Sequence, residues 1–426
     1  MFYLLVGYRR LRRDRRRKPD PARKIRALSE PSENRFGDLE MLDPELRRTS
    51  RLSAELTDFP VVGGNTVTLF ADALTTYGAI ADAIAGAQDH VYMQYYIFQP
   101  DDTGREFREL LVNKARQGVK CRVLVDAVGS FRLSRRFIEP MLQVGIEFAR
   151  FWPLRLSRPW GFHLRNHRKL VVVDNAVGFA GSQNIGDEYV NWNHRNLSWR
   201  DMHIRIEGPA VEQLQIIFQE DWEFTTGRPA IISAVDWNLR TTGTSHIQIL
   251  PTGPDDDPRA PLELVLSMLL YSAAERITIV TPYFVPTLPI VMALEAAAAR
   301  GVDVEILVPK RSNHWIADWA ARSWYRDITA AGVKLYEFAE TFVHAKLVTI
   351  DERMCLVGSA NMDQRSFQLN FECSVLLYDE SVTKKLVRNF EGMARESDIL
   401  KLDEIERQPY WRQVWDGAFR LLSPLL

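Results

Sequence analysis

Cysteine is scarce in this sequence. Its 426 residues include three cysteines, Cys121, Cys355 and Cys373, and each stands in an apolar, strand-like context. None belongs to a Cys-x-x-Cys pair or to a cluster of cysteine and histidine. This pattern excludes a disulfide framework and a structural zinc site, and it predicts small core residues in a reducing compartment. The sequence also offers no carboxylate cluster suited to a catalytic metal, so we expect neither a metal nor another cofactor.

Long hydrophobic runs are also missing. No stretch approaches the roughly 18 to 20 apolar residues that a membrane-spanning helix needs. The six apolar residues at 1–6 are too few for a span, and without a cleavage site they make a poor signal peptide. We therefore expect no complete transmembrane span in this chain.

A general excess of positive charge is absent as well, because the net charge is −1. Residues 9–24 contain ten Arg or Lys and two Asp, a local charge of +8, which leaves −9 for the rest of the chain. A nucleic-acid enzyme would spread positive charge over its body, so this acidic body argues against a nucleic-acid partner. Residues 1–50 are Arg-rich and punctuated by Pro, which predicts a basic arm, flexible or partly helical.

One pattern of polar residues occurs twice with the same spacing. It consists of His, Lys, Asp, Gly-Ser and Asn at the same relative positions. Between Lys and Asp each copy carries an apolar run, at 170–173 and 347–350, that predicts a buried strand with polar residues at its ends. The later Gly-Ser predicts a turn that brings Ser and Asn back toward His and Lys. The copies comprise His167, Lys169, Asp174, Ser182 and Asn184, and His344, Lys346, Asp351, Ser359 and Asn361.

Expected strands and helices alternate in the same order in both halves of the chain. In the first half they are a strand at 67–70, a helix at 77–87, a strand at 90–98, a helix at 104–117 and a strand at 121–126. In the second they are a helix at 261–274, a strand at 277–285, a helix at 290–300 and a strand at 304–308. This alternation predicts the α/β fold class, with two tandem α/β domains whose sheets are flanked by helices.

Composition sets the expected domain boundaries. After the arm at 1–50 we expect a first domain at 51–228, a linker at 229–245 where Gly, Pro, Thr and Ser collect, and a second domain at 246–426. An amphipathic helix should close each half and bury its apolar stripe in the core. The stripes are Leu214, Phe218 and Trp222 in the first half, and Leu386, Phe390 and Met393 in the second.

The doubled pattern resembles the paired His-x-Lys signature of the phospholipase D superfamily, and its flanks resemble those of bacterial cardiolipin synthases. The resemblance runs from about residue 67 to the C-terminus. It implies two phospholipase D-like domains related by pseudo-twofold symmetry, and residues 1–6 resemble the end of a transmembrane helix in those synthases. The flanking stretches are Asn184-Ile-Gly-Asp-Glu-Tyr, Trp199-Arg-Asp201, Thr281-Pro-Tyr-Phe-Val-Pro286, Asn361-Met-Asp-Gln-Arg-Ser-Phe and Leu369-Asn-Phe-Glu372.

The repeated residue types suit the transfer of a phosphodiester. One imidazole can attack phosphorus while the other donates a proton to the leaving group and later removes one from the acceptor. The two lysines offset charge on the phosphate, and the two asparagines add neutral donors. We expect Ser182 and Ser359 to form hydrogen bonds near the phosphate. Asp174 and Asp351 complete the motif, but their place at a strand end favours fixing a turn or pairing across the pseudo-twofold axis.

The resemblance adds roles that spacing does not provide. It implies that a carboxylate holds the second ring nitrogen of each histidine, with Asp201 serving the first half and Glu372 in the other orienting position. It also favours His167 as the nucleophile and His344 as the acid and base. Two aromatic groups flank the motifs and could form an apolar rim for acyl chains, although core packing explains part of them equally well. They are Trp152, Trp160 and Phe162, and Trp315, Trp319 and Trp324.

The function implied by the resemblance is that of a cardiolipin synthase, which transfers a phosphatidyl group between two phosphatidylglycerols and releases glycerol through a phosphatidyl-histidine intermediate. Three alternatives stand beside it. A phospholipase D or another transphosphatidylase would use water or another alcohol as the acceptor. A nuclease of the superfamily is disfavoured by the acidic body, and a catalytically dead membrane-binding scaffold by the completeness of both motifs.

The expected partners are phosphatidylglycerol and an anionic membrane surface. Such a surface attracts a basic segment by about 1 kcal/mol per basic residue near it. We therefore expect a bacterial protein bound peripherally to the cytoplasmic face of the cell membrane. The sequence leaves the oligomeric state open.

Overall fold

The structure is a computed structural model that describes residues 42–151, 164–190, 199–228, 241–254, 260–312 and 315–407, with residues 409, 415 and 419. Several expectations concern segments outside this range. They are most of the basic arm, most of the linker at 229–245, and the aromatic residues Trp152, Trp160 and Phe162.

The first half begins with helix α4 (Pro44–Thr57) and contains the alternating elements expected from its sequence. They are β1 (Val62–Phe70), α5 (Ala73–Gly86), β2 (His90–Tyr95), α6 (Asp102–Arg116), β3 (Lys120–Asp126), α7 (Arg135–Gln143), β4 (Glu147–Phe151), β5 (Arg165–Asn166), β6 (Leu170–Val173), β7 (Val177–Gly181), the 3-10 helix η3 (Asp187–Tyr189), β8 (His203–Glu207) and α8 (Ala210–Thr226).

The second half repeats this series with a few additions. It contains β9 (Ser245–Thr252), α9 (Pro261–Ser272), β10 (Arg276–Val280), β11 (Phe284–Val285), α10 (Leu288–Ala299), β12 (Asp303–Pro309), α11 (Trp315–Ala330), β13 (Lys334–Phe338), β14 (Leu347–Ile350), β15 (Met354–Gly358), β16 (Met362–Asp363), α12 (Gln364–Gln368), β17 (Asn370–Tyr378), α13 (Glu380–Arg395), β18 (Ser397–Leu400) and α14 (Leu402–Glu406). The expected strand at 277–285 is therefore two short strands.

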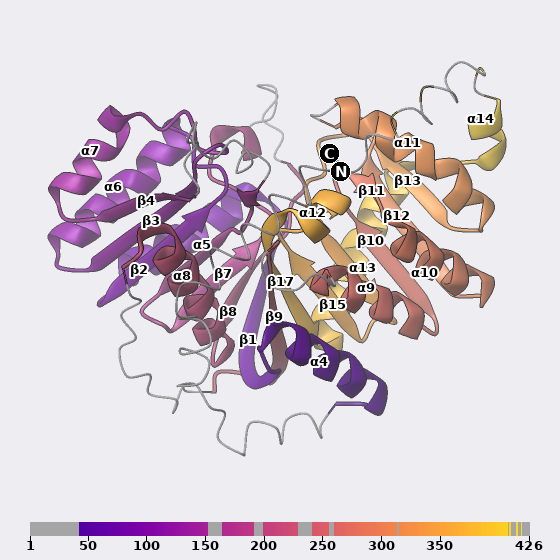
Figure 1. The fold of residues 1–426 in the computed structure, drawn as a ribbon, viewed down its shortest axis with the longest axis horizontal. Coiled ribbons are helices and arrows are strands. Elements are labelled where there is room, and N and C mark those ends of the chain that lie inside the picture. The colour runs from indigo at the N-terminus through magenta and orange to yellow at the C-terminus, as the bar shows by residue number, and fades with distance from the viewer. Residues whose placement is uncertain are drawn as a thin grey trace.

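One continuous sheet runs through both halves. Its order is β18-β13-β12-β10-β14-β15-β17-β9-β1-β8-β7-β6-β2-β3-β4, and β5 pairs with β17 beside this path. Read outward from the β1–β9 junction, the seven strands of the first half and the first seven of the second follow the same order, and β18 adds an eighth strand at the outer edge of the second half. The pseudo-twofold relation therefore passes between β1 and β9, which pair antiparallel, and the expected α/β fold with a helix-flanked sheet is confirmed (Figure 1).

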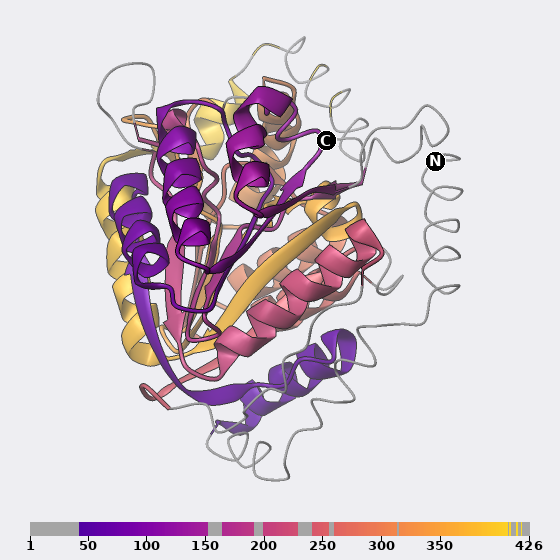
Figure 2. The same cartoon turned by 90° about the vertical axis from the view of Figure 1, so that its left-hand side faces the viewer.

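Helices cover both faces of this sheet (Figure 2). Leu214 and Phe218 of α8 and Leu386 and Phe390 of α13 lie in one hydrophobic cluster that includes strand residues from both halves. Two further clusters lie under α5–α7 in the first half and under α9–α11 in the second. All three cysteines are buried, as predicted. The helices that close the two halves therefore pack into a shared core, and the halves are not independent units.

Helix α4 spans the expected boundary at residue 50. It begins at Pro44 and crosses that boundary. Its neighbours belong to the second half, since Leu56 packs in the same cluster as α9, and the side chain of Gln248 donates to the Ser50 carbonyl over 3.1 Å. Figures 1 and 2 both show α4 beside α9. The segment before β1 therefore packs against the second half of the fold.

Candidate active site

Each motif histidine precedes a central strand of its own half, but its main chain is anchored to the opposite half. The His167 N–H donates to the Phe371 carbonyl over 2.8 Å, and the His344 N–H donates to the Arg200 carbonyl over 2.7 Å. Next to His167, β5 pairs in parallel with the start of β17. The two strands β6 and β14 thus present their histidines to the same region.

Both imidazoles line one cavity of about 340 Å³. The cavity takes its walls from both halves, as a mechanism that uses both imidazoles requires. Its lining also includes both motif asparagines and a set of aromatic and charged side chains. They are Tyr96, Arg165, Glu188, Tyr189, Trp199, Tyr283, Trp315, Asp363, Arg365 and Asn370.

A carboxylate from the opposite half holds each imidazole. Nδ1 of His167 lies 3.0 and 3.1 Å from the two carboxylate oxygens of Glu372. Nδ1 of His344 lies 3.0 Å from Oδ2 of Asp201. The expectation that Asp201 serves the histidine of its own half is therefore wrong, because the segment before β8 crosses to the second motif. In both pairs Nδ1 carries the bonded proton, and Nε2 remains for chemistry in the cavity.

Ser182 and Ser359 lie behind these carboxylates, away from the cavity. The Ser182 hydroxyl donates to Asp201, and the Ser359 hydroxyl donates to Glu372. Both serines are fully buried and neither lines the cavity. The expected hydrogen bonds near the phosphate stay a prediction, and the structure shows each hydroxyl proton used to hold an orienting carboxylate in place.

Burial sets the protonation of the site. It lowers the pKa of His167 to about 4 and that of His344 to about 3, and the nearby lysine charges add to this effect. The pKa values of Asp201 and Glu372 lie below their ordinary values: burial would raise them, but the histidine and lysine neighbours outweigh it. At neutral pH the site therefore holds two neutral imidazoles beside two carboxylates.

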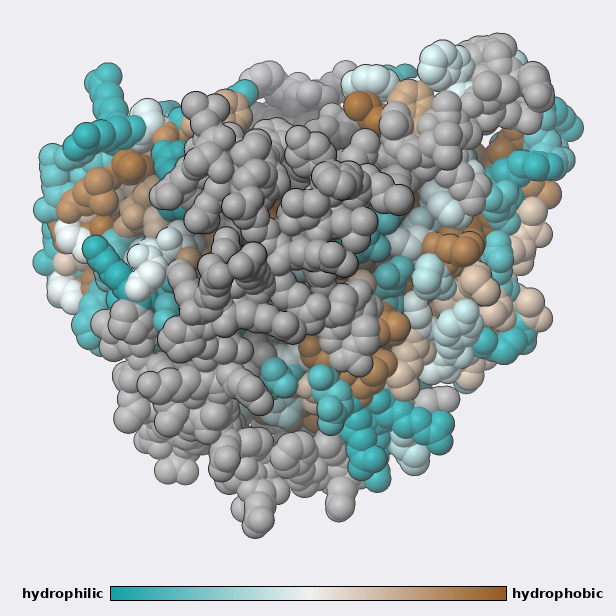
Figure 3. Space-filling model, viewed as in Figure 1, coloured by the Kyte–Doolittle hydropathy of each residue, from teal (hydrophilic) through white to brown (hydrophobic). Residues whose placement is uncertain are grey.

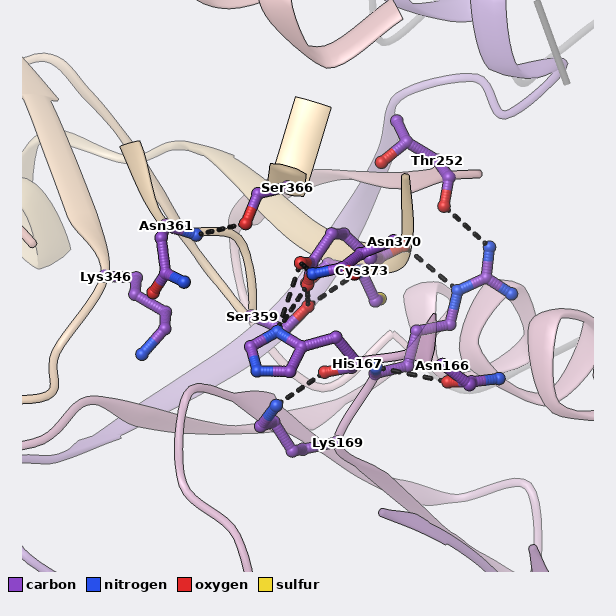
Figure 4. A network of polar contacts seen from close by, with 12 residues as sticks. Asn166, His167, Lys169, Thr252, Lys346, Ser359, Asn361, Ser366, Asn370 and Cys373 are labelled. Atoms are coloured by element: carbon purple, nitrogen blue, oxygen red, sulfur yellow. Dashed lines mark hydrogen bonds and ion pairs between the residues drawn. The ribbon is translucent and has the colours of Figure 1, made fainter. Parts of the chain in front are cut away.

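The two motif lysines are almost fully buried, at 1 % exposure for Lys169 and 2 % for Lys346. Each amino group donates to the main-chain carbonyl of its own motif histidine, over 2.6 and 2.7 Å. Burial lowers the pKa of Lys346 to about 8 and that of Lys169 well below its usual value. Figure 4 shows Lys169 below and Lys346 beside the His167 imidazole. An anion entering between them would restore full lysine charge.

The motif asparagines sit at the cavity wall as expected. The Asn184 side chain accepts from the Ile97 N–H over 3.1 Å and donates to the Tyr189 hydroxyl over 2.6 Å. The main-chain N–H of Asn361 donates to the hydroxyl of Ser366 over 3.1 Å. These contacts fix the side-chain amide of Asn184 and the main chain of Asn361 at the wall that a ligand in the cavity would meet.

The motif aspartates lie at the far ends of the central strands, away from the cavity. Asp174 accepts from the N–H groups of Gln88, Asp89 and His90 over 2.7 to 2.8 Å. Asp351 makes the same three contacts with the residues entering β10, over 2.8 to 2.9 Å. Both have positive φ, 52° and 51°, in the hairpin after the strand. These contacts fit the suggested role of fixing a turn, and the place of both aspartates among the catalytic residues stays a prediction.

Comparison with known proteins agrees with this geometry. The family model described as "Cardiolipin synthase, PLD-like domain" matches residues 80–222 and 266–394. The cardiolipin synthase of Geobacillus kaustophilus is 37 % identical over 435 residues, covering 100 % of this chain and 86 % of that protein. Cardiolipin synthase 2 of Bacillus cereus is 39 % identical over 355 residues, covering 82 % of this chain and 69 % of that protein. The chain belongs to the cardiolipin synthase family. It is thus a phosphatidyltransferase of the phospholipase D superfamily.

A solved structure supports the fold of this cardiolipin synthase family member. The phosphatidylserine synthase of Haemophilus influenzae superposes with a TM-score of 0.69 at 16 % identity, covering 89 % of this chain and 100 % of that one. At this identity the match concerns the fold alone. Within the described part of the chain, none of the helices combines the length and the apolar character needed to cross a membrane.

Several residues of this synthase-family site were not assigned from sequence. Asn370, Trp199 and Arg365 stand in flanking stretches that carried the resemblance, and the structure brings all three to the cavity. Of the expected aromatic rim, Trp315 lines the cavity and is 64 % exposed, whereas Trp324 is buried in the core. Nearness to a motif was the available signal. It could not indicate which aromatic side chains face the cavity.

Proposed function

We propose that this chain is a cardiolipin synthase that transfers a phosphatidyl group from one phosphatidylglycerol to a second, releasing glycerol through a phosphatidyl-histidine intermediate. The observation that carries the proposal is the pair of histidines in one cavity, each held at Nδ1 by a carboxylate of the opposite half. Two such imidazoles can divide attack and proton transfer between them.

In the first step, Nε2 of His167 bonds to phosphorus and the bond from phosphorus to the glycerol oxygen breaks. Nε2–H of His344 gives its proton to that oxygen, so glycerol leaves neutral. Lys169 and Lys346 offset the charge on the non-bridging oxygens, and the motif asparagines donate to them. The family resemblance favours this division of roles.

In the second step, a hydroxyl of the second phosphatidylglycerol gives its proton to Nε2 of His344 and bonds to phosphorus. The phosphorus–nitrogen bond breaks, and His167 is restored. The product contains two phosphodiesters joined by one glycerol, and the enzyme returns to its starting state. If water enters instead, phosphatidic acid forms.

The surroundings of His344 support its role as the acid. Its ring centroid lies 5.3 Å from Trp199, 5.8 Å from Tyr189 and 6.0 Å from Phe342. Aromatic rings at such distances stabilise a cation, and an imidazolium is the form that donates a proton. Burial lowers the pKa of His344 to about 3. A bound phosphate places a negative charge nearby, which raises the pKa and permits protonation.

Product analysis tests the proposal. Purified protein is incubated with phosphatidylglycerol vesicles, and cardiolipin, phosphatidic acid and glycerol are quantified. We expect one glycerol for each cardiolipin, with little phosphatidic acid. Phosphatidic acid and glycerol without cardiolipin would reassign the chain as a hydrolase. The absence of any product from folded protein would favour a binding scaffold.

We also propose peripheral binding to an anionic membrane, on its cytoplasmic face. The substrate would be a bilayer lipid, and the exposed Trp315 at the cavity is a residue type favoured at membrane interfaces. On the face shown in Figure 3, the described hydrophobic residues form separate patches among hydrophilic ones. Contact through a few residues around the cavity suits this distribution better than a broad apolar belt.

A further inference from the structure

Positions related by the internal repeat differ in charge around the cavity. Two residues before each motif histidine, the first copy has Arg165 and the second has Phe342. Four residues after each motif asparagine, the first copy has Glu188 and the second has Arg365. A strictly symmetrical site would carry the same charge at both members of each pair. The two walls of this cavity therefore differ in charge.

The cationic members collect on the wall next to His167. Arg165 lies opposite Asn370 in the register of β5 with β17. Tyr96 packs on His167, with 4.9 Å between ring centroids. Arg165 and Arg365 line the cavity together with Tyr96. Burial raises the pKa of Tyr96, and the charges of both arginines oppose this effect.

The wall next to His344 is aromatic and acidic. Trp199 stands two residues before its orienting carboxylate, where the His167 side has Asn370. Tyr189 packs near the same imidazole, and Glu188 precedes it in η3. Electrostatic attraction would therefore favour binding of an anion at the wall next to His167.

The carboxylates near the arginines accept hydrogen bonds from other groups. Asp126 accepts from the main-chain N–H groups of Val128, Gly129 and Asn166 over 2.8 to 3.0 Å, whereas its contact with Arg165 measures 3.4 Å. Glu372 holds His167.

Asp363 also lines the cavity and caps α12 by accepting from the Ser366 N–H over 2.7 Å. Burial raises its pKa to about 6, so this carboxylate loses its charge only as the pH falls through about 6. Arg165 and Arg365 thus line the His167 wall of the cavity beside carboxylates that also accept main-chain or imidazole hydrogen bonds.

We propose that Arg165 and Arg365 form a second anion site in the cavity, separate from the lysine pair, which binds a phosphate group that does not react. This inference rests on the proposed function for its ligand: the acceptor phosphatidylglycerol carries its own phosphodiester, which is retained in the product. The acceptor phosphate binds at the arginine wall while its hydroxyl reaches the reacting phosphorus. A neutral alcohol has no group for this site, so the arginines select for an anionic acceptor.

Acceptor kinetics test the site. Arg365→Gln is chosen because Arg165 is nearly buried against Asp126 and its replacement could prevent folding. With one labelled phosphatidylglycerol as donor, we expect KM for acceptor phosphatidylglycerol to rise about tenfold, the loss of one charge-assisted contact. Transfer to ethanol from the same donor should change less than twofold. Arg135→Gln, at a residue whose side chain is 88 % exposed on α7, is the matched control and should match the parent.

Equal losses with ethanol and with the lipid acceptor would overturn the proposal, because Arg365 would then serve the donor or the fold. Arg365→Glu copies the charge of the repeat-related Glu188 and should raise this KM further. If Arg365→Glu left acceptor use unchanged, the site would not exist.

Equilibrium binding separates this proposal from the function on which it rests. Parent protein and Arg365→Gln are titrated with inorganic phosphate and, separately, with short-chain phosphatidylglycerol. We expect two binding events in the parent, one of which weakens about tenfold in the variant. Weakening with both ligands supports a lipid-phosphate site, and weakening with inorganic phosphate alone supports a free-phosphate site. Identical isotherms for parent and variant would overturn the site even if cardiolipin forms. If the parent made no cardiolipin, and one of its two phosphate-binding events were lost in Arg365→Gln, the proposed function would be overturned while the anion site would stand.

Discussion

Nδ1 of His344 lies 3.0 Å from Oδ2 of Asp201, a residue 143 positions earlier in the chain and in the other half of the fold. The reciprocal contact joins His167 to Glu372. Each half therefore supplies the imidazole of one catalytic pair and the carboxylate of the other. A half-site without its partner would have a histidine whose tautomer is not fixed.

Removing either orienting charge should abolish most turnover without unfolding the protein. We expect Asp201→Asn and Glu372→Gln to reduce kcat roughly 10²- to 10⁴-fold, because an amide can hold the wrong tautomer at Nδ1. Steady-state transfer rates measure the loss, and near-ultraviolet circular dichroism checks the fold. If either variant kept more than about a tenth of the parent rate, crossed orientation would not be essential.

Asp174 should matter for stability and not for chemistry. Its carboxylate accepts three main-chain N–H groups at the start of β2, partly exposed to solvent. Asp174→Ala should lower the free energy of unfolding by about 1–3 kcal/mol, since three donors lose their acceptor. Denaturant titration measures this change. Asp351→Ala is the repeat-related comparison and should behave alike. Lost turnover with unchanged stability would return these aspartates to the catalytic set.

Stability should fall as the solution becomes acidic. The pKa values of His167 and His344, about 4 and 3, lie below the unfolded value of about 6.5. Below pH 6.5 the unfolded chain binds protons that the folded chain does not bind, so the free energy of unfolding decreases from about pH 6.5 toward pH 4. Denaturant titrations across this range should show a shallower slope for His344→Gln. Buried His203, with a pKa of about 4, keeps part of the slope. A slope unchanged in the variant would contradict these depressed pKa values.

Trp315 should contribute to binding of lipid vesicles. It is 64 % exposed and lines the cavity. Trp315→Ser should weaken sedimentation with phosphatidylglycerol vesicles several-fold, because it removes an interfacial aromatic residue. Ile399→Ser is the control, since Ile399 is also exposed but lies on the edge strand β18. If the two substitutions weakened vesicle binding equally, membrane contact would not depend on the residue at the cavity.

Much of the architecture could be predicted because it depends on patterns within short stretches of sequence. Apolar runs fixed the central strands, and amphipathic stripes identified α8 and α13. The start of β1 was predicted five residues too late because Gly63, Gly64 and Asn65 interrupt the pattern. In the structure the Asn65 amide donates to the carbonyls of Val62 and Ser245, so a polar residue joins β1 to β9.

The site was predicted less completely because its contacts join distant segments. The repeat identified both histidines and lysines, but spacing could not show that Asp201 crosses to His344. Motif membership also suggested a hydrogen bond near the phosphate for Ser182 and a catalytic role for Asp174. Their neighbours in space, a carboxylate for one and a strand start for the other, decide what these residues do.

The β1–β9 junction has a consequence for how such a site can change. Two identical chains meeting across a twofold axis could form the same crossed histidine–carboxylate pairs, but every substitution would then appear on both walls at once. Joining the copies in one polypeptide removes that constraint, because each position is encoded separately. Glu188 and Arg365 occupy matching places with opposite charge. Covalent fusion thus allows a symmetrical catalytic centre to treat its two substrates differently.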